Sequence, residues 1–339
     1  MKRPSLILSI FILAFSAKAQ INPSSVISGS LNDMQYLSEG YLSPFADALS
    51  YSMTNGWYNT AKVRKKFRFE ISLVSSISVV PNEMKSFTVD ANRLEALELV
   101  DPNNNISPTV FGDQSPGVAL QYSHPQFGGL ANSQFNLPQG IGMGVMPMIG
   151  IQGGVGLPMD FELKARFIPS SGVTFIKGSS VNQWGLALKH DLRRYFPKGK
   201  LLPFHLSAFV AYSSLNFNQE LQPGSGNDKE ISLSANTLLT RILISKKLLF
   251  LTFYGGLGYN YNAANISMLG TYDYIDPTNA SNPEQQVMDP ISFETNQSSG
   301  IAGNLGIRGK FLVIGMASLD YTFGNFRALT LNAGFSWDL

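Results

Sequence analysis

Apolar and polar residues alternate strictly along residues 329–339 at the C-terminus. Leu329, Leu331, Phe335 and Trp337 fall on one face of an extended chain, while Thr330, Asn332, Ser336 and Asp338 fall on the other. A period of two indicates a β-strand with one apolar and one polar environment. An aromatic-rich final strand of this kind is typical of outer-membrane β-barrels.

The same alternation recurs through most of the chain. In the stretch 159–167, Met159, Phe161, Leu163, Ala165 and Phe167 share one face, and the intervening residues are all charged. We predict strands near residues 66–80, 139–152, 158–170, 180–193, 203–218, 229–245, 248–262, 298–309, 311–323 and 327–338. Short turns and long polar connections alternate between these strands, as expected for barrels with short periplasmic turns and long external loops.

These patterns predict an all-β protein, a transmembrane antiparallel β-barrel of about 10–14 strands with a short N-terminal helical, plug-like segment. The range of strand numbers is wide because residues 81–138 could form one large external loop or contain one or two hairpins. A secreted soluble β-sandwich is the alternative architecture, since its strands also alternate.

The N-terminus has the features of a secretory signal. Lys2 and Arg3 precede the apolar stretch 6–15, and Ala17-Lys18-Ala19 offers small residues for cleavage. The apolar stretch is shorter than the roughly 20 residues that a transmembrane helix needs. We therefore expect a signal peptide at 1–19, a helical plug segment at 20–65, an outer-membrane β-barrel at 66–339, and localisation in the outer membrane of a Gram-negative cell.

The plug segment contains signals for two helices. Ser30 or Asn32 could cap a first helix that Gly40 ends, and Ser43-Pro44 could start a second helix that Gly56 stops. Helical spacing places Phe45, Leu49 and Met53 on one face. We take these three residues and Trp57 as the candidate apolar side of the plug and of a ligand site.

Composition excludes several function classes. Only 14% of residues are charged, against about 25% in ordinary soluble domains. A formal net charge of +2 is not the excess of positive charge that a nucleic-acid-binding protein carries. The absence of cysteine excludes disulfides and thiolate chemistry. The three histidines show no metal-binding spacing, so we expect neither a metal nor a cofactor.

Charged residues on the polar faces of the strands are the candidate lumen groups. Their signs are mixed, which fits either a salt-bridged interior that holds a plug or a polar path. The set comprises Arg68, Glu70, Asp160, Glu162, Lys164, Arg166, Lys189, Asp191, Arg308 and Asp320.

Catalysis finds little support in the sequence. His205 and Ser207 form the one local pairing that resembles a nucleophile and its base, and no third orienting group is evident. We therefore expect that the protein is not an enzyme, with a barrel hydrolase as a weaker alternative.

Several stretches resemble a family of uncharacterised outer-membrane proteins of the Bacteroidota. They are Gly56-Trp57-Tyr58-Asn59-Thr60-Ala61-Lys62, Leu137-Pro138-Gln139-Gly140, Trp184-Gly185-Leu186, Leu188-Lys189-His190-Asp191, Ser245-Lys246-Lys247-Leu248 and Leu251-Thr252-Phe253-Tyr254-Gly255-Gly256-Leu257-Gly258-Tyr259. The family has no assigned activity. More loosely, a helical segment before a barrel resembles the long-chain fatty-acid transporters, which implies a plugged lumen from which apolar substrates leave sideways.

Our leading functional hypothesis is passive uptake of a small hydrophobic molecule through such a plugged barrel. The alternative is a non-transporting outer-membrane scaffold or secretion-associated component that uses its external loops for docking. The expected partners are outer-membrane lipid and a small apolar ligand, with no nucleic acid and an unknown protein partner.

Overall fold

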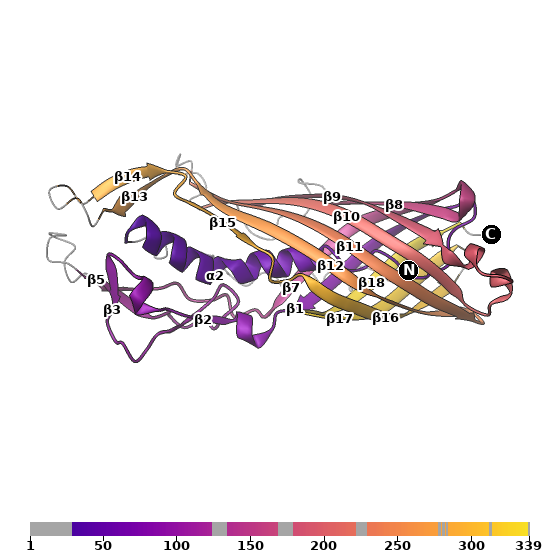
Figure 1. Cartoon of the computed structure of the whole chain (residues 1–339), viewed down its shortest axis with the longest axis horizontal. Coiled ribbons are helices and arrows are strands. Elements are labelled where there is room, and N and C mark those ends of the chain that lie inside the picture. Colours follow the sequence, from indigo (N-terminus) through magenta and orange to yellow (C-terminus); the bar gives the residue numbers. More distant parts are fainter. Residues whose placement is uncertain are drawn as a thin grey trace, which may run out of the picture.

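Ten antiparallel strands close into a barrel in the computed structural model, which describes residues 29–123, 134–168, 179–221, 229–276, 279, 282, 284–311 and 314–337 (Figure 1). Each strand pairs with its neighbours in the chain, and β1 pairs with β18 to close the sheet. The strands are β1 (Phe69–Val79), β7 (Val145–Leu157), β8 (Phe161–Ile168), β9 (Ser179–Asp191), β10 (His205–Glu220), β11 (Glu230–Leu248), β12 (Leu251–Leu269), β16 (Gly300–Phe311), β17 (Gly315–Phe323) and β18 (Arg327–Ser336). This confirms the predicted all-β barrel at the lower end of its expected strand number.

The barrel is apolar outside and polar inside. On β18, Leu329, Leu331 and Phe335 are exposed on the outer surface, while Thr330 and Asn332 are buried in the lumen. The sequence alternation therefore follows the pleat of each strand, because successive side chains point to opposite faces of a sheet. A soluble protein would place these two faces the other way round.

The two ends of the barrel differ. Short connections at 158–160 and 249–250 lie at one end, which we call the turn side. The long connections 80–144 and 270–299 lie at the other end, the loop side. There β12 continues past Asn260, where β16 leaves it, and pairs instead with β15 (Ile291–Thr295). The hairpin of β13 (Thr271–Ile275) and β14 (Glu284–Met288) projects beyond this point (Figure 1).

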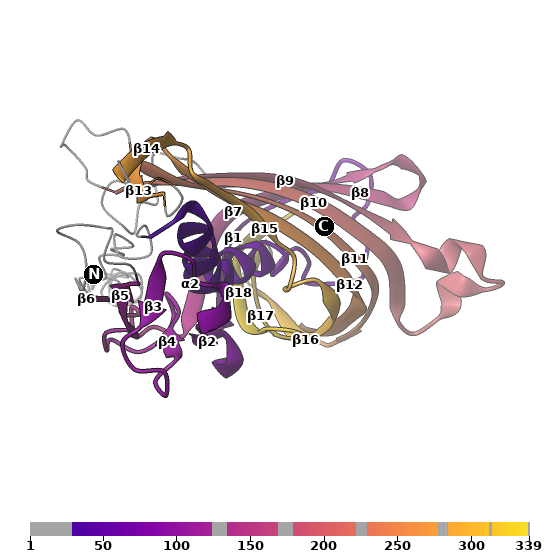
Figure 2. The same ribbon diagram turned by 60° about the vertical axis from the view of Figure 1, so that its left-hand side comes forward.

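One continuous helix, α2 (Leu31–Ser52), enters the barrel from the loop side (Figures 1 and 2). Ser30, one of the two candidate caps, is the N-cap, but the predicted break between Gly40 and Ser43 is wrong. Pro44 lies inside the helix, and the Ser43 hydroxyl donates to the Glu39 carbonyl at 2.6 Å. Gly40 is needed for close packing, since a Cβ there would lie 2.5 Å from the Phe87 ring. Tertiary packing thus overrides two local helix-breaking signals.

Residues 80–123 and 134–144 form a small folded unit beside α2. Strands β2 (Ser86–Thr88) and β4 (Ile106–Pro108) pair, and β5 (Ala119–Tyr122) lies between β3 (Leu97–Leu99) and β6 (Gln134–Asn136). Together with β13–β15, we call this unit the loop-side domain. The region that could have been a single loop thus contains two small sheets.

An apolar core joins α2 to the loop-side domain and to the extended ends of β11 and β12. Met34, Leu37 and Tyr41 of the helix are buried in it. Asp47 fixes the helix to the end of β15 and to the residues after it, because its carboxylate accepts hydrogen bonds from the Thr295 hydroxyl (2.7 Å) and the Ser298 backbone N–H (3.0 Å). Burial raises the pKa of the Asp47 carboxyl above its ordinary value, and these hydrogen bonds partly oppose that rise.

Candidate functional site

Residues 53–65, which we call the lumen segment, lead from the end of α2 through the barrel to β1. At the loop end, Ser52 and Asn55 both donate hydrogen bonds to the Ser78 hydroxyl at 3.0 Å. At the turn end, the Phe67 N–H donates to the Gly156 carbonyl at 2.8 Å, and β1 begins. The chain therefore crosses the full length of the lumen before it enters the sheet.

Gly56 lets the lumen segment turn against the wall. Its φ of +71° lies in the left-handed region that favours glycine, and a Cβ would lie 2.5 Å from Val74 and 2.8 Å from Thr330. The predicted helix stop is therefore a bend in the lumen, since α2 already ends at Ser52.

Six buried charged side chains tie the lumen segment to the wall, and we call them the ion cluster. Arg64 of the lumen segment contacts both carboxylates, Glu70 of β1 and Glu162 of β8. Arg308 lies 3.1 Å from Glu70, and Lys189 lies 2.9 Å from Glu162. Lys164 completes the cluster at 3.6 Å from Glu70 and 3.9 Å from Glu162.

Wall cations also hold the backbone of the lumen segment. The Lys164 ammonium donates to the Trp57 carbonyl at 3.0 Å. The Lys189 ammonium donates to the carbonyls of Thr60 and Lys62 at 3.3 and 3.2 Å. These contacts satisfy backbone groups that belong to no helix or strand, as buried carbonyls require.

A second layer of contacts lies closer to α2. The Arg166 guanidinium lies over the Trp57 ring at 4.2 Å and donates to the Met53 carbonyl at 3.2 Å. The Trp57 ring N–H donates to the same carbonyl at 3.0 Å. The aromatic ring, the cation and the helix end therefore form one packed unit.

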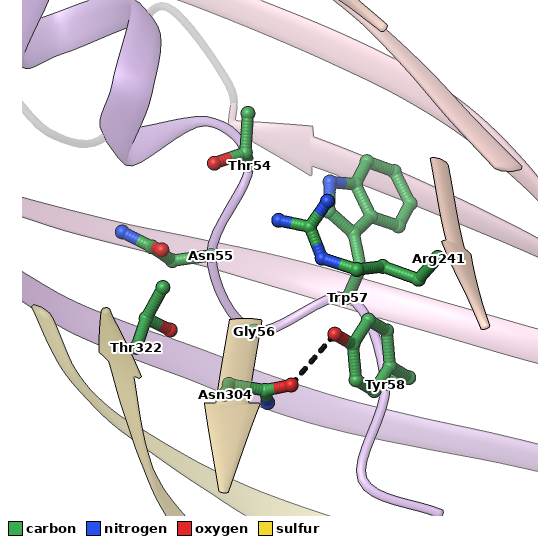
Figure 3. Close-up of a pocket in the computed structure, with 8 residues that line it drawn as sticks. All are labelled: Thr54, Asn55, Gly56, Trp57, Tyr58, Arg241, Asn304 and Thr322. Atoms are coloured by element: carbon green, nitrogen blue, oxygen red, sulfur yellow. Dashed lines mark hydrogen bonds between the residues drawn. The ribbon is translucent and has the colours of Figure 1, made fainter. Parts of the chain in front are cut away.

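The Tyr58 hydroxyl donates to Asn304 on the facing wall at 2.7 Å (Figure 3). Asn304 and Tyr254 in turn donate to the Asp320 carboxylate at 3.3 and 2.9 Å. The cavity beside Trp57 and Tyr58 measures about 10 Å³, which is room for about one water molecule. The lumen at this level is filled by protein.

The predicted plug residues pack into protein. Met53 and Trp57 are buried, Leu49 is buried in the core of the loop-side domain, and Phe45 packs against Phe111 and Phe217 with ring centroids 6.2 and 5.4 Å apart. The apolar face of α2 therefore faces neighbouring side chains over its length.

The predicted lumen charges divide into two groups. Seven are buried inside the barrel: Glu70, Glu162, Lys164, Arg166, Lys189, Arg308 and Asp320. Arg68 and Asp160 are instead exposed at the turn side, and Asp191 lies at the rim in an ion pair with Arg193. The expected inward register fails for these three because each lies at a strand end or in a turn, where the pleat no longer fixes the direction of the side chain.

Sequence reasoning missed Arg64 and Arg241. Arg64 lies in the non-strand lumen segment, so no alternation marks it. Arg241 is on the inward face of β11, where its guanidinium donates to Asn260. Its neighbours on that face, Leu239 and Leu243, are apolar and buried, so no alternation marks it either. The local pairing of His205 with Ser207, on which the weaker hydrolase alternative depends, is not hydrogen-bonded, since the His205 Nδ1 and the Ser207 Oγ have no hydrogen-bond partner.

The outer surface carries an apolar band. Aliphatic side chains cover its middle, and aromatic side chains gather towards its two edges, as at the two interfaces of a membrane. The exposed aliphatic residues include Ile71, Leu73, Ile151, Leu186, Leu188, Ile242, Ile244, Leu305, Leu319, Leu329 and Leu331. The exposed aromatic residues include Phe69, Phe253 and Phe335 towards the turn side and Trp184, Tyr212, Tyr259 and Tyr321 towards the loop side.

Fold and site together define a membrane β-barrel whose lumen is filled by its own N-terminal segment. The model of DUF6588, a family of unknown function, matches residues 1–337, and the chain belongs to that family. This confirms the predicted membership of an uncharacterised family, while its bacterial group stays a prediction. The comparison with curated proteins found no match. None of the described helices is long and apolar enough to cross a membrane.

Several solved structures of bacterial proteins resemble the chain at low sequence identity. The translocator domain of autotransporter NalP from Neisseria meningitidis has 9% identity and a TM-score of 0.37, and the match covers 89% of this chain and 99% of that one. The Pseudomonas putida toluene transporter TodX has 11% identity and a TM-score of 0.29, with coverages of 82% and 69%. A Pseudomonas aeruginosa FadL homologue has 10% identity and a TM-score of 0.28, with coverages of 80% and 90%. Likeness at this level carries no argument about activity.

Proposed function

We propose that the protein is a non-transporting outer-membrane barrel, closed by its lumen segment, that holds the loop-side domain at the cell surface. The observation that carries this proposal is the ion cluster, in which Arg64 of the lumen segment shares two buried carboxylates with the wall. Displacing the segment would leave Glu70 and Glu162 without that partner, and uncompensated buried charge is costly.

The location and orientation follow from the surface. An outward apolar band on a closed sheet suits lipid, because closure leaves no strand edge unpaired. Long connections in outer-membrane barrels face the outside, so the loop-side domain and the start of α2 would lie outside the cell. The expected signal peptide at 1–19 lies outside the described residues and supports the same location as a prediction.

Gated uptake is the second candidate function. The observation that favours it is a set of buried polar atoms without hydrogen-bond partners on the inward strand faces. They belong to Ser72, Gln183, Ser207, Ser213, Ser318, Thr330 and Asn332. Water would satisfy these groups if the lumen segment moved away. Such a wall favours a polar solute, whereas the small hydrophobic ligand of our leading sequence hypothesis needs a largely apolar pocket.

The two candidate functions predict different effects on permeability when the lumen segment is cross-linked to the barrel wall. The chain has no cysteine, and the hydroxyl oxygens of Thr60 and Ser245 lie 3.2 Å apart, so the variant Thr60→Cys/Ser245→Cys can lock the segment to β11. We expect liposomes containing this variant to be impermeable to small sugars and amino acids in both the reduced and the oxidised state. Permeability that is present when reduced and lost on oxidation would contradict the closed barrel and support gated uptake.

A further inference from the structure

Surface charges separate along the barrel axis. Exposed basic side chains gather at the turn side, on the connection before β1, on the connection between β9 and β10, and at the end of β11. They are Lys65, Lys66, Arg68, Lys198, Lys246 and Lys247. Among the described acidic residues at this end, Asp160 lies 3.8 Å from Arg194 and Asp191 lies 2.7 Å from Arg193. These six basic residues, which we call the basic rim, therefore give this end an excess of positive charge.

The loop side carries the opposite charge. Exposed carboxylates there include Glu83, Asp90, Asp101, Asp113, Asp273 and Asp289. The near-neutral formal charge of +2 for the whole chain hides this separation, which composition alone cannot reveal.

Large apolar side chains lie among the basic ones at the turn side. Leu249 is 87% and Phe250 is 65% exposed in the turn that follows Lys246 and Lys247. The connection between β9 and β10 exposes Tyr195, Phe196 and Leu201. Protein surfaces that combine basic residues with aromatic and leucine residues are those that insert into the lipid headgroup region.

We propose that the basic rim binds the phosphate groups of anionic phospholipids in the leaflet at the turn side. The charges lie at the turn-side ends of β1, of β9 and β10, and of β11 and β12, and β7 and β8 separate the first of these places from the others in the sheet. They therefore form an interrupted arc around the barrel, which fits lipid headgroups better than a single protein partner. The apolar residues at the same level would place each cation at headgroup depth. Attraction of this kind adds up over several Lys and Arg residues near an anionic surface.

The test compares lipid retention by two triple variants. Lys65→Gln/Lys246→Gln/Lys247→Gln removes three charges from the basic rim, and Lys85→Gln/Lys229→Gln/Arg327→Gln removes three from the loop side. Each protein is placed in nanodiscs of equal phosphatidylglycerol and phosphatidylcholine, and native mass spectrometry counts the lipids that stay bound. We expect the unaltered chain and the loop-side variant to prefer phosphatidylglycerol, and the rim variant to lose roughly tenfold in that preference.

Equal preference in the unaltered chain and the rim variant would overturn the proposal, as would an equal loss in both triple variants. If the rim variant does not fold, raising the salt from 0.05 to about 1 M must reduce the preference of the unaltered chain, since ions screen exposed charges. A preference that does not change with salt would equally overturn the proposal. The outcome is independent of whether the lumen segment is fixed or gated.

Discussion

Replacing Glu162 with glutamine should lower the free energy of unfolding by about 4 kcal/mol, the cost expected when one partner of a buried ion pair is removed. Glu162 faces Arg64, Lys164 and Lys189, so the substitution leaves the four cations of the ion cluster with Glu70 as their one carboxylate. The amide also cannot accept as well from the Arg64 backbone N–H, which donates to Glu162 at 3.1 Å. Urea titration of the purified barrel in detergent measures the change.

Asp160→Asn is the matched control, because it neutralises a carboxylate of the same barrel that is 58% exposed and lies 3.8 Å from Arg194. Exposed pairs contribute about 1 kcal/mol or less, so this variant should unfold at nearly the same urea concentration as the unaltered chain. Equal destabilisation by Glu162→Gln and Asp160→Asn would show that the ion cluster does not hold the lumen segment.

Trp57→Ala should lower the free energy of unfolding by about 3–5 kcal/mol, the range for truncating a buried aromatic side chain. The ring is 1% exposed, and its loss opens a cavity in the filled part of the lumen. It also removes the surface that covers the Arg166 guanidinium at 4.2 Å. The same urea titration checks the value.

Trp184→Ala provides the comparison, because Trp184 is 46% exposed on the outward face of β9. We expect Trp184→Ala to lower the free energy of unfolding by less than half as much as Trp57→Ala does. The opposite order would mean that Trp57 does not pack between the helix end and the wall in solution.

The barrel could be predicted from the sequence because each strand carries its own local signal. The alternation in Phe161–Ile168, for example, follows from the pleat alone and needs no knowledge of the neighbouring strands. Strand ends were less certain, and Arg68 and Asp160 were assigned to the lumen because the alternation was extended into turns, where side chains no longer alternate.

The plug could be predicted only in outline. Gly40 is a local signal for a helix end and Ser43-Pro44 for a helix start, yet α2 runs through both because Phe87 packs against Gly40 and the apolar core encloses the helix. The role of Arg64 depends on Glu70 and Glu162, and Glu162 lies far away in the chain. Such a contact exists only after the barrel has closed, so the spacing of residues in the sequence does not predict it.

The position of the lumen segment can be measured most directly with engineered disulfides in this cysteine-free chain. The hydroxyl oxygens of Ser52 and Ser78 lie 3.0 Å apart near the loop end of the lumen, and those of Thr60 and Ser245 lie 3.2 Å apart deeper inside. At such separations a disulfide needs little backbone movement. We predict that Ser52→Cys/Ser78→Cys and Thr60→Cys/Ser245→Cys both form disulfides in intact membranes, whereas the mismatched pair Ser52→Cys/Ser245→Cys leaves two free thiols. Free thiols in both matched pairs would contradict a barrel closed by its own N-terminal segment.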